Sequence, residues 1–135
     1  GLDEALAPYA QAGVEAQVVA FIDAMAASCG WAELAVCRAG ALTLAELSAA
    51  GLGALLVPFP HAVDDHQTRN AEVLVAVGAA EVIQESELDV QILAQRLAQL
   101  LGDRPSLLAM AEAARTLAKP DAAKVIARAC LEVVA

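Results

Sequence analysis

The clearest secondary-structure signal in this chain is the run Ala54-Leu55-Leu56-Val57, which follows Gly51 and Gly53 and stops at Pro58 and Pro60. A continuous apolar run of this length is typical of a strand that is buried on both faces of a parallel sheet. Proline cannot donate a ladder hydrogen bond, so the two prolines end the strand. The sequence therefore predicts a central parallel strand at residues 54–57.

Short apolar runs and helical stretches alternate on both sides of this strand. We expect further strands at 16–20, 34–37 and 80–84. We expect helices at 2–11, 23–32, 42–50 and 66–77, and three more pieces from Asp89 onward, with Asp89, Ser106 and Asp121 as caps or first-turn residues. Strands that alternate with helices of about ten residues predict the α/β class, with a parallel sheet wrapped by helices.

Composition excludes several classes of function. The 135 residues carry 17 acidic and 8 basic side chains, a net charge of −9, and 3% are aromatic, so nucleic acid is not an expected partner. The longest apolar stretch, residues 51–59, is about half of what a bilayer crossing needs, and no membrane span is expected. The three cysteines lack CxxC spacing, which favours reduced thiols in the cytoplasm over a disulfide framework or a zinc site.

Ligands of open parallel sheets bind where the carboxyl ends of strands lead into helices. Three loops qualify by position: residues 21–23, 38–43 and 59–67. Small residues in the second loop, which runs from Arg38 to Thr43, let backbone amides and a helix start approach a phosphate, although a simple tight turn has the same pattern. Glu46, one turn into that helix, is placed either to accept hydrogen bonds from a ribose diol or merely to favour the positive helix end.

The third loop gathers polar side chains just after the predicted central strand: His61, Asp64, Asp65, His66, Gln67 and Asn70. Such groups suit the hydroxyls of a sugar or a similar polar ligand. A metal site is the alternative, because histidine and aspartate are both competent ligands. His61 and His66 are five residues apart across a proline-containing loop, which is not the helical spacing that directs two histidines at one ion.

Three segments together closely resemble the MurG family of bacterial glycosyltransferases. They are Asp23-Ala24-Met25-Ala26-Ala27, Cys37-Arg38-Ala39-Gly40-Ala41-Leu42-Thr43-Leu44-Ala45-Glu46, and the stretch from Val57 to Ala71 that contains Asp65-His66-Gln67 and Asn70. The resemblance covers essentially the whole chain. It implies that residues 1–135 are a partial C-terminal UDP-GlcNAc-binding domain of a GT-B glycosyltransferase, with a Rossmann-like parallel sheet. The family's first strand and glycine-rich loop have no counterpart in this sequence, which implies a piece of a longer enzyme.

The resemblance also implies an activity and a set of substrate-binding residues. The family transfers N-acetylglucosamine from UDP-GlcNAc to lipid I with inversion, making lipid II for peptidoglycan. In this resemblance, uracil is contacted by Phe21 and Ile22, and the diphosphate is held by the loop and helix start at Gly40, Ala41, Leu42 and Thr43. The ribose is bound by Glu46, and the sugar is contacted by His66, Gln67 and Asn70. His66 stands where some relatives have glutamine. We expect no metal and no cofactor, and we assign no catalytic residue here, because the proposed general base belongs to the family's amino-terminal domain.

Partners and location follow from the same resemblance. Lipid I would bind through the absent amino-terminal domain, and the whole enzyme would be peripheral on the cytoplasmic face of the inner membrane. The alternative is a stand-alone UDP-sugar-binding subunit that works with a separate acceptor-side chain. Since a sheet without its first strand has an open edge, a homodimer or a domain swap is also expected.

Overall fold

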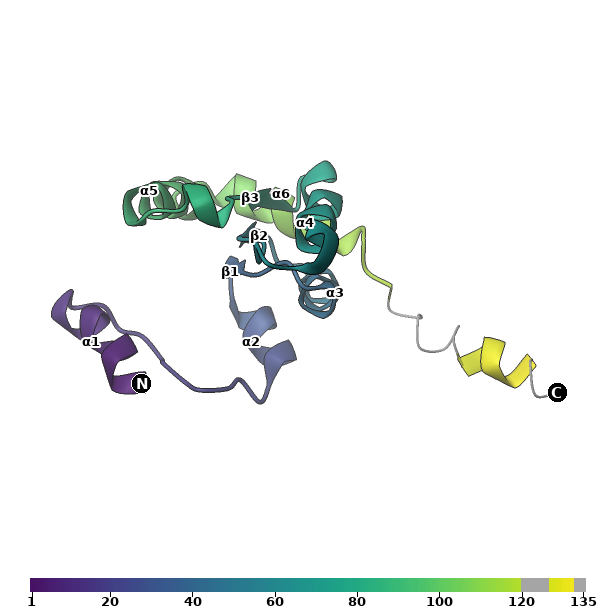
Figure 1. The fold of residues 1–135 in the computed structure, drawn as a ribbon, viewed down its shortest axis with the longest axis horizontal. Coiled ribbons are helices and arrows are strands. Elements are labelled where there is room, and N and C mark those ends of the chain that lie inside the picture. Colours follow the sequence, from purple (N-terminus) through teal and green to yellow (C-terminus); the bar gives the residue numbers. More distant parts are fainter. Residues whose placement is uncertain (120–126, 133–135) are drawn as a thin grey trace.

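The computed structural model describes residues 1–119 and 127–132. Three short strands form one parallel sheet in the order β1-β2-β3, and helices connect them (Figure 1). The elements in chain order are α1 (Leu2–Gln11), α2 (Met25–Trp31), β1 (Ala35–Cys37), α3 (Ala41–Ala50), β2 (Ala54–Leu56), the 3-10 turn η1 (Val63–Asp65), α4 (His66–Ala76), β3 (Ala80–Val82), the 3-10 turn η2 (Glu85–Glu87), α5 (Val90–Leu101) and α6 (Arg104–Arg115). The α/β class and the predicted central strand are confirmed.

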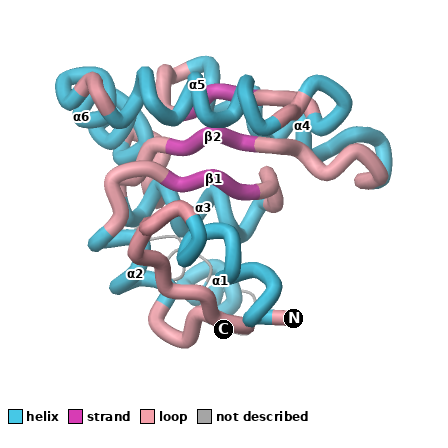
Figure 2. Tube along the Cα trace, turned by 90° about the vertical axis from the view of Figure 1, so that its left-hand side faces the viewer, coloured by secondary structure: helices cyan, strands magenta, loops and turns pink. Residues whose placement is uncertain are grey.

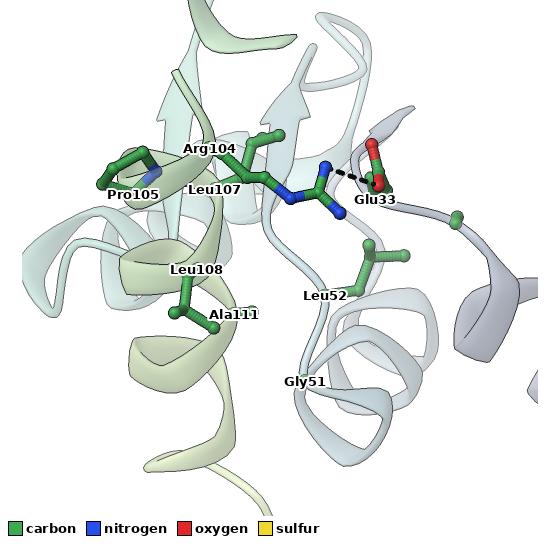
Figure 3. A pocket seen from close by; sticks show the side chains of 9 residues that line it. Glu33, Gly51, Leu52, Arg104, Pro105, Leu107, Leu108 and Ala111 are labelled. Atoms are coloured by element: carbon green, nitrogen blue, oxygen red, sulfur yellow. Dashed lines mark hydrogen bonds and ion pairs between the residues drawn. The ribbon is translucent and has the colours of Figure 1, made fainter. Parts of the chain in front are cut away.

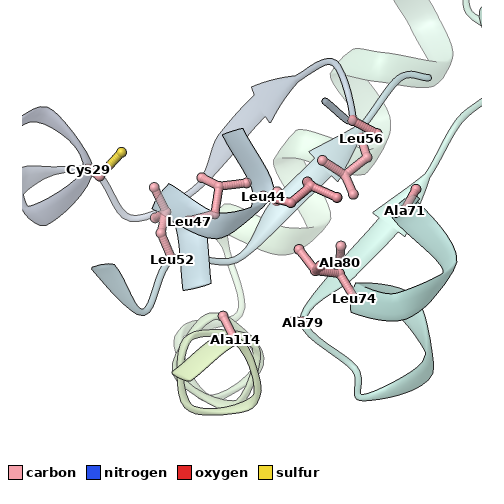
Figure 4. Packing of buried hydrophobic residues seen from close by; sticks show 12 residues of the cluster. Cys29, Leu44, Leu47, Leu52, Leu56, Ala71, Leu74, Ala79, Ala80 and Ala114 are labelled. Carbon is pink, nitrogen blue, oxygen red and sulfur yellow. The ribbon is translucent and has the colours of Figure 1, made fainter. Parts of the chain in front are cut away.

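The sheet lies between two helical layers (Figure 2). Leu55 of β2 packs on one side with Leu100 of α5 and with Leu107 and Met110 of α6. Leu56, its neighbour along the strand, packs on the other side among residues of α2, α3 and α4 (Figure 4). Successive strand residues face opposite sides of a sheet, so a strand covered on both faces must be apolar throughout. This explains why β2 is the strand that the sequence reveals most clearly.

Side chains cap the starts of α5 and α6, where the sequence predicts caps. Asp89 accepts a hydrogen bond of 2.8 Å from the Ile92 N–H at the start of α5. Asp103 caps α6, and Ser106, expected as a cap or first-turn residue, lies in that first turn and donates its hydroxyl to the Asp103 carboxylate at 2.6 Å. Asp121 lies outside the described residues. Residues 127–132 are helical, as the sequence predicts for the last piece.

The strand predicted at residues 16–20 is wrong. The structure has no helix or strand from residue 12 to 24, and this segment links α1 to α2 along the outside of the molecule (Figure 1). Val19 is 57% exposed, and β1 pairs with β2 alone among the described strands. A β-branched run becomes a strand when a neighbouring strand and a buried face stabilise it, and this run has neither.

Helix α1 is separate from the core. No residue of α1 is buried, and its apolar side chains Leu2, Leu6 and Tyr9 are exposed. In the part of the chain that the structure describes, no helix is both long and apolar enough to cross a membrane.

Candidate functional site

The parallel sheet brings the loops after its three strands to one edge. Cys37, Leu56 and Val82 end their strands in register with one another. Backbone hydrogen bonds of 2.9 Å extend the pairing one residue further, from Val57 N–H to Cys37 O and from Ile83 N–H to Leu56 O. Loops that belong to distant parts of the sequence therefore start side by side at this carboxyl edge.

The loop after β1 leads directly into an uncapped helix. Gly40 precedes α3 with an extended backbone, and no side chain caps the helix. The N–H groups of Ala41, Leu42 and Thr43 have no intrahelical acceptor at this position, and they carry the positive end of the helix dipole. A helix start of this kind is suited to an anion, and phosphate binding here stays a prediction.

Glu46 follows on the same helix and is half-buried. It makes no hydrogen bond and no ion pair with any residue that the structure describes. Its neighbour across the α2 and α3 contact is Cys29. Burial raises the pKa of the Cys29 thiol, and the Glu46 carboxylate raises it further, which places this negative charge close to Cys29.

Gln67 joins the loop after β1 to the loop after β2. Its side-chain oxygen accepts hydrogen bonds from the Ala39 N–H at 3.2 Å and from the Phe59 N–H at 2.9 Å. Asn70, one turn further along α4, donates from Nδ2 to the Ala39 carbonyl at 3.2 Å. Two residues predicted as sugar contacts thus also hold the loop after β1 against the loop after β2. Within the described chain, no group accepts a hydrogen bond from the Gln67 Nε2 or donates one to the Asn70 Oδ1.

The rest of the loop after β2 turns sharply into α4. Asp64 and Asp65 have φ angles of 54° and 53°, a left-handed conformation that aspartate tolerates better than most residues. The Asp65 carboxylate accepts from the Thr68 hydroxyl at 2.8 Å, and Gln84, after β3, donates to the same hydroxyl at 3.4 Å. These contacts connect the loop after β3 to the loop after β2 and the start of α4.

The metal alternative finds no support in this loop. The described residues contain no group of three or more histidine, cysteine, aspartate or glutamate side chains that could hold a metal ion. The ring of His61 instead meets Phe59 edge to face, with 5.5 Å between the ring centroids. His66 is exposed at the first position of α4.

Phe21 and Ile22 are placed differently from the other predicted site residues. They lie in the link between α1 and α2, since the strand expected before them is not formed, and Phe21 is 77% exposed. Their contact with a nucleobase stays a prediction. Gly40, Ala41, Leu42, Thr43, Glu46, His66, Gln67 and Asn70, by contrast, all lie in or just beyond the loops at the carboxyl edge.

Two cavities flank the sheet. One of about 640 Å³ opens between α3, α4 and residues 115–119, and both Ala41 and Asn70 line it. The other, of about 520 Å³, lies at the opposite edge, where Glu33 and Leu52 precede their strands (Figure 3). Arg104 from α6 reaches across the second cavity to Glu33, with 3.2 Å between the charged atoms. The first cavity is therefore the one that adjoins the predicted site.

Sequence reasoning missed Arg38 as a site residue. It follows β1 directly, and its guanidinium contacts the loops after both β2 and β3. One feature of the sequence could have indicated Arg38: it is a charged residue between the end of β1 and Gly40, in the loop predicted to bind phosphate. Gln84 was also missed. Its partner Thr68 is 16 residues away in sequence, so no local pattern pairs the two residues.

Comparisons with known proteins agree with this arrangement. Residues 2–126 match the glycosyltransferase family 28 C-terminal domain. Two curated relatives, from Marinobacter nauticus and Xylella fastidiosa, are 54% and 60% identical over 97% and 92% of this chain. Both are named UDP-N-acetylglucosamine--N-acetylmuramyl-(pentapeptide) pyrophosphoryl-undecaprenol N-acetylglucosamine transferase.

A solved structure shows the same fold. The crystal structure of Acinetobacter baumannii MurG superimposes with a TM-score of 0.85 and 42% identity, over 93% of this chain and 36% of that one. The chain also spans 36% of the Marinobacter nauticus protein and 34% of the Xylella fastidiosa protein. The resemblance to MurG proteins seen in the sequence is confirmed, and the chain belongs to the glycosyltransferase family 28 C-terminal domain family.

Proposed function

We propose that this chain is the donor-binding part of an inverting glycosyltransferase that takes N-acetylglucosamine from UDP-GlcNAc and converts lipid I to lipid II. The names of the relatives support the reaction, and the site at the carboxyl edge supports the assignment of the donor to this part. In the proposal, lipid I and the general base belong to another part of the enzyme. The whole enzyme then works as a peripheral protein at the cytoplasmic face of the membrane.

The observation that carries the proposal is the uncapped start of α3. Three N–H groups, at residues 41–43, lie at the carboxyl edge of the sheet with no side chain to cap them. A diphosphate would satisfy these donors and would interact favourably with the helix dipole. The half-buried, unpaired Glu46 lies about one turn further along, at a distance suited to the ribose of the same nucleotide.

The same features suit the chemistry of transfer. The acceptor hydroxyl attacks the anomeric carbon, a new glycosidic bond forms, and the bond from that carbon to the phosphate oxygen breaks. UDP leaves with the bonding electron pair, while the hydroxyl proton goes to the general base. The negative charge that develops on the diphosphate is stabilised by the amides of α3, which are already oriented before the reaction.

The sugar would be oriented by the loop after β2. Gln67 and Asn70 each use one amide atom to hold the loops and keep the other, Nε2 and Oδ1 respectively, for hydroxyl or acetamido groups. His66 begins α4 beside them. Holding the sugar in one orientation places the anomeric carbon for in-line attack.

A binding experiment with Glu46→Gln tests the proposal. Titration calorimetry with UDP and UDP-GlcNAc should show saturable binding to the wild-type chain, weakened in Glu46→Gln by about 1 to 3 kcal/mol, the scale of losing hydrogen bonds to a charged group. Glu112→Gln, the same change at an exposed position of α6, is the matched control and should bind like the wild type. Equal affinity of Glu46→Gln and wild type, with both folded, would show that the carboxylate does not hold the ribose.

A further inference from the structure

Arg38 makes more contacts between loops than any other side chain described at the carboxyl edge. One guanidinium nitrogen donates to the carbonyls of Val57 and Pro58, both at 3.3 Å, and the other pairs with the Glu85 carboxylate at 2.7 Å. The guanidinium carbon also lies 5.6 Å from the centre of the Phe59 ring. One side chain from the loop after β1 therefore contacts the loops after β2 and β3.

The residue type suits this task. The guanidinium is planar, stays charged, and presents several N–H donors in a fixed fork, so it can bond two carbonyls and a carboxylate together. A lysine ammonium is a point charge without this geometry. The contact with Phe59 is a cation–π interaction, which adds attraction without using a donor.

A second connection also joins the loops after β1 and β2. The next residue, Ala39, donates its N–H to the Gln67 oxygen, which also accepts from the Phe59 N–H. Two consecutive residues after β1 are thus tied to three consecutive residues after β2, at positions 57, 58 and 59. The loop after β1 and the loop after β2, which leads into α4 at His66, are held at one fixed separation.

We propose that Arg38 is a positioning residue of the donor site: it fixes the loop after β2 against the loop after β1. A diphosphate bound at α3 and the sugar attached to it can then contact their binding residues at the same time. This inference rests on the proposed function. In the proposed site the nucleotide is held by the loop after β1 and by α3, whereas the sugar of UDP-GlcNAc also needs the loop after β2 in register. Loss of Arg38 therefore weakens UDP-GlcNAc more than it weakens UDP.

The test compares Arg38→Ala and Arg38→Lys with Arg104→Ala. Arg104 is the matched control, because it also pairs with a glutamate but does so at the opposite edge of the sheet. Circular dichroism first checks that each variant is folded, and titration calorimetry then measures UDP and UDP-GlcNAc. Hydrogen exchange of the Ala39 and Phe59 amides, without ligand, reports whether the two loops stay joined.

We expect Arg38→Ala to weaken UDP-GlcNAc about tenfold, the equivalent of one or two lost hydrogen bonds. UDP alone should change much less, and both amides should exchange faster. Arg38→Lys should not restore the affinity, and Arg104→Ala should match the wild type in every measurement.

The outcomes separate this inference from the function on which it rests. No saturable binding to the wild-type chain would overturn both. Binding by the wild type that Arg38→Ala leaves unchanged would overturn the positioning role alone. Weaker binding with unchanged amide exchange would also overturn it, because Arg38 would then act on the ligand rather than on the loops.

Discussion

Gln67 has two separable roles, one in holding two loops together and one proposed in binding the sugar, and substitutions at this position can test each. Its Oε1 accepts two backbone N–H groups and holds two loops together, while its Nε2 is the group proposed for the sugar. Methionine has nearly the shape of glutamine but cannot accept these bonds. Glutamate keeps the acceptor oxygens and loses the donor.

The magnitude for Gln67→Met follows from the surroundings of the two donors. Ala39 is fully buried, so its N–H would lose its partner with no water to replace it, which costs about 1–3 kcal/mol. Phe59 is partly exposed, so water can take over its N–H at a cost of about 0.5–1 kcal/mol. We expect the free energy of unfolding to fall by about 1.5–4 kcal/mol in total.

Urea unfolding followed by circular dichroism measures this change, with an unchanged slope showing that the unfolded state is comparable. Gln67→Glu should unfold within about 0.5 kcal/mol of the wild type, since charged acceptors form hydrogen bonds at least as strong as neutral ones. The same variant should bind UDP-GlcNAc more weakly. If Gln67→Met were as stable as the wild type, the connection between the loops would carry no energy and the reasoning would fail.

Three further predictions concern stability and assembly. Leu56→Ala removes a fully buried side chain from β2 and should lower the free energy of unfolding by about 3–5 kcal/mol in urea unfolding, whereas a loss below about 1 kcal/mol would contradict the packing described. The hydrogen bonds from the Ser106 hydroxyl and N–H lower the pKa of Asp103, so this cap stabilises the fold above about pH 4 and loses its effect as pH falls through the lowered pKa. The difference in free energy of unfolding between wild type and Asp103→Ala should therefore be constant from pH 5 to 7 and should shrink toward zero in stronger acid. A difference independent of pH down to pH 2 would argue against the cap. Because no strand among the described residues pairs with the outer edge of β1 and Val36 is 47% exposed, light scattering should show dimers forming as concentration rises, and a monomer at all concentrations would refute this.

The central part of the fold was predictable because its signals are local. The apolar run at 54–57 and its prolines located β2, and Asp89 marked the start of α5. The predicted strand at 16–20 failed because strand formation depends on a partner that the run itself does not specify. Local sequence patterns therefore identified the elements that pack against neighbouring segments of the chain. They failed at residues 16–20, where a strand would need a pairing partner that the local sequence does not specify.

The site was predictable by position more than by contact. A glycine before a helix, and polar residues after the central strand, were expected at the carboxyl edge of the sheet, and the structure places them there. The bonds from Gln67 to the Ala39 and Phe59 amides, and those from Arg38 to the Val57 and Pro58 carbonyls, join residues 8 to 28 positions apart. Such pairs depend on strand register, which three-residue strands do not reveal in the sequence.

Amide chemical-shift mapping of the ¹⁵N-labelled chain with UDP tests the central claim most directly, because it reports where the nucleotide binds. We expect saturable shifts that are largest at Gly40, Ala41, Leu42, Thr43 and Glu46, with little change at Leu52 and Leu108, which line the cavity at the opposite edge. Absence of saturable shifts at millimolar UDP, or largest shifts at that opposite edge, would contradict it.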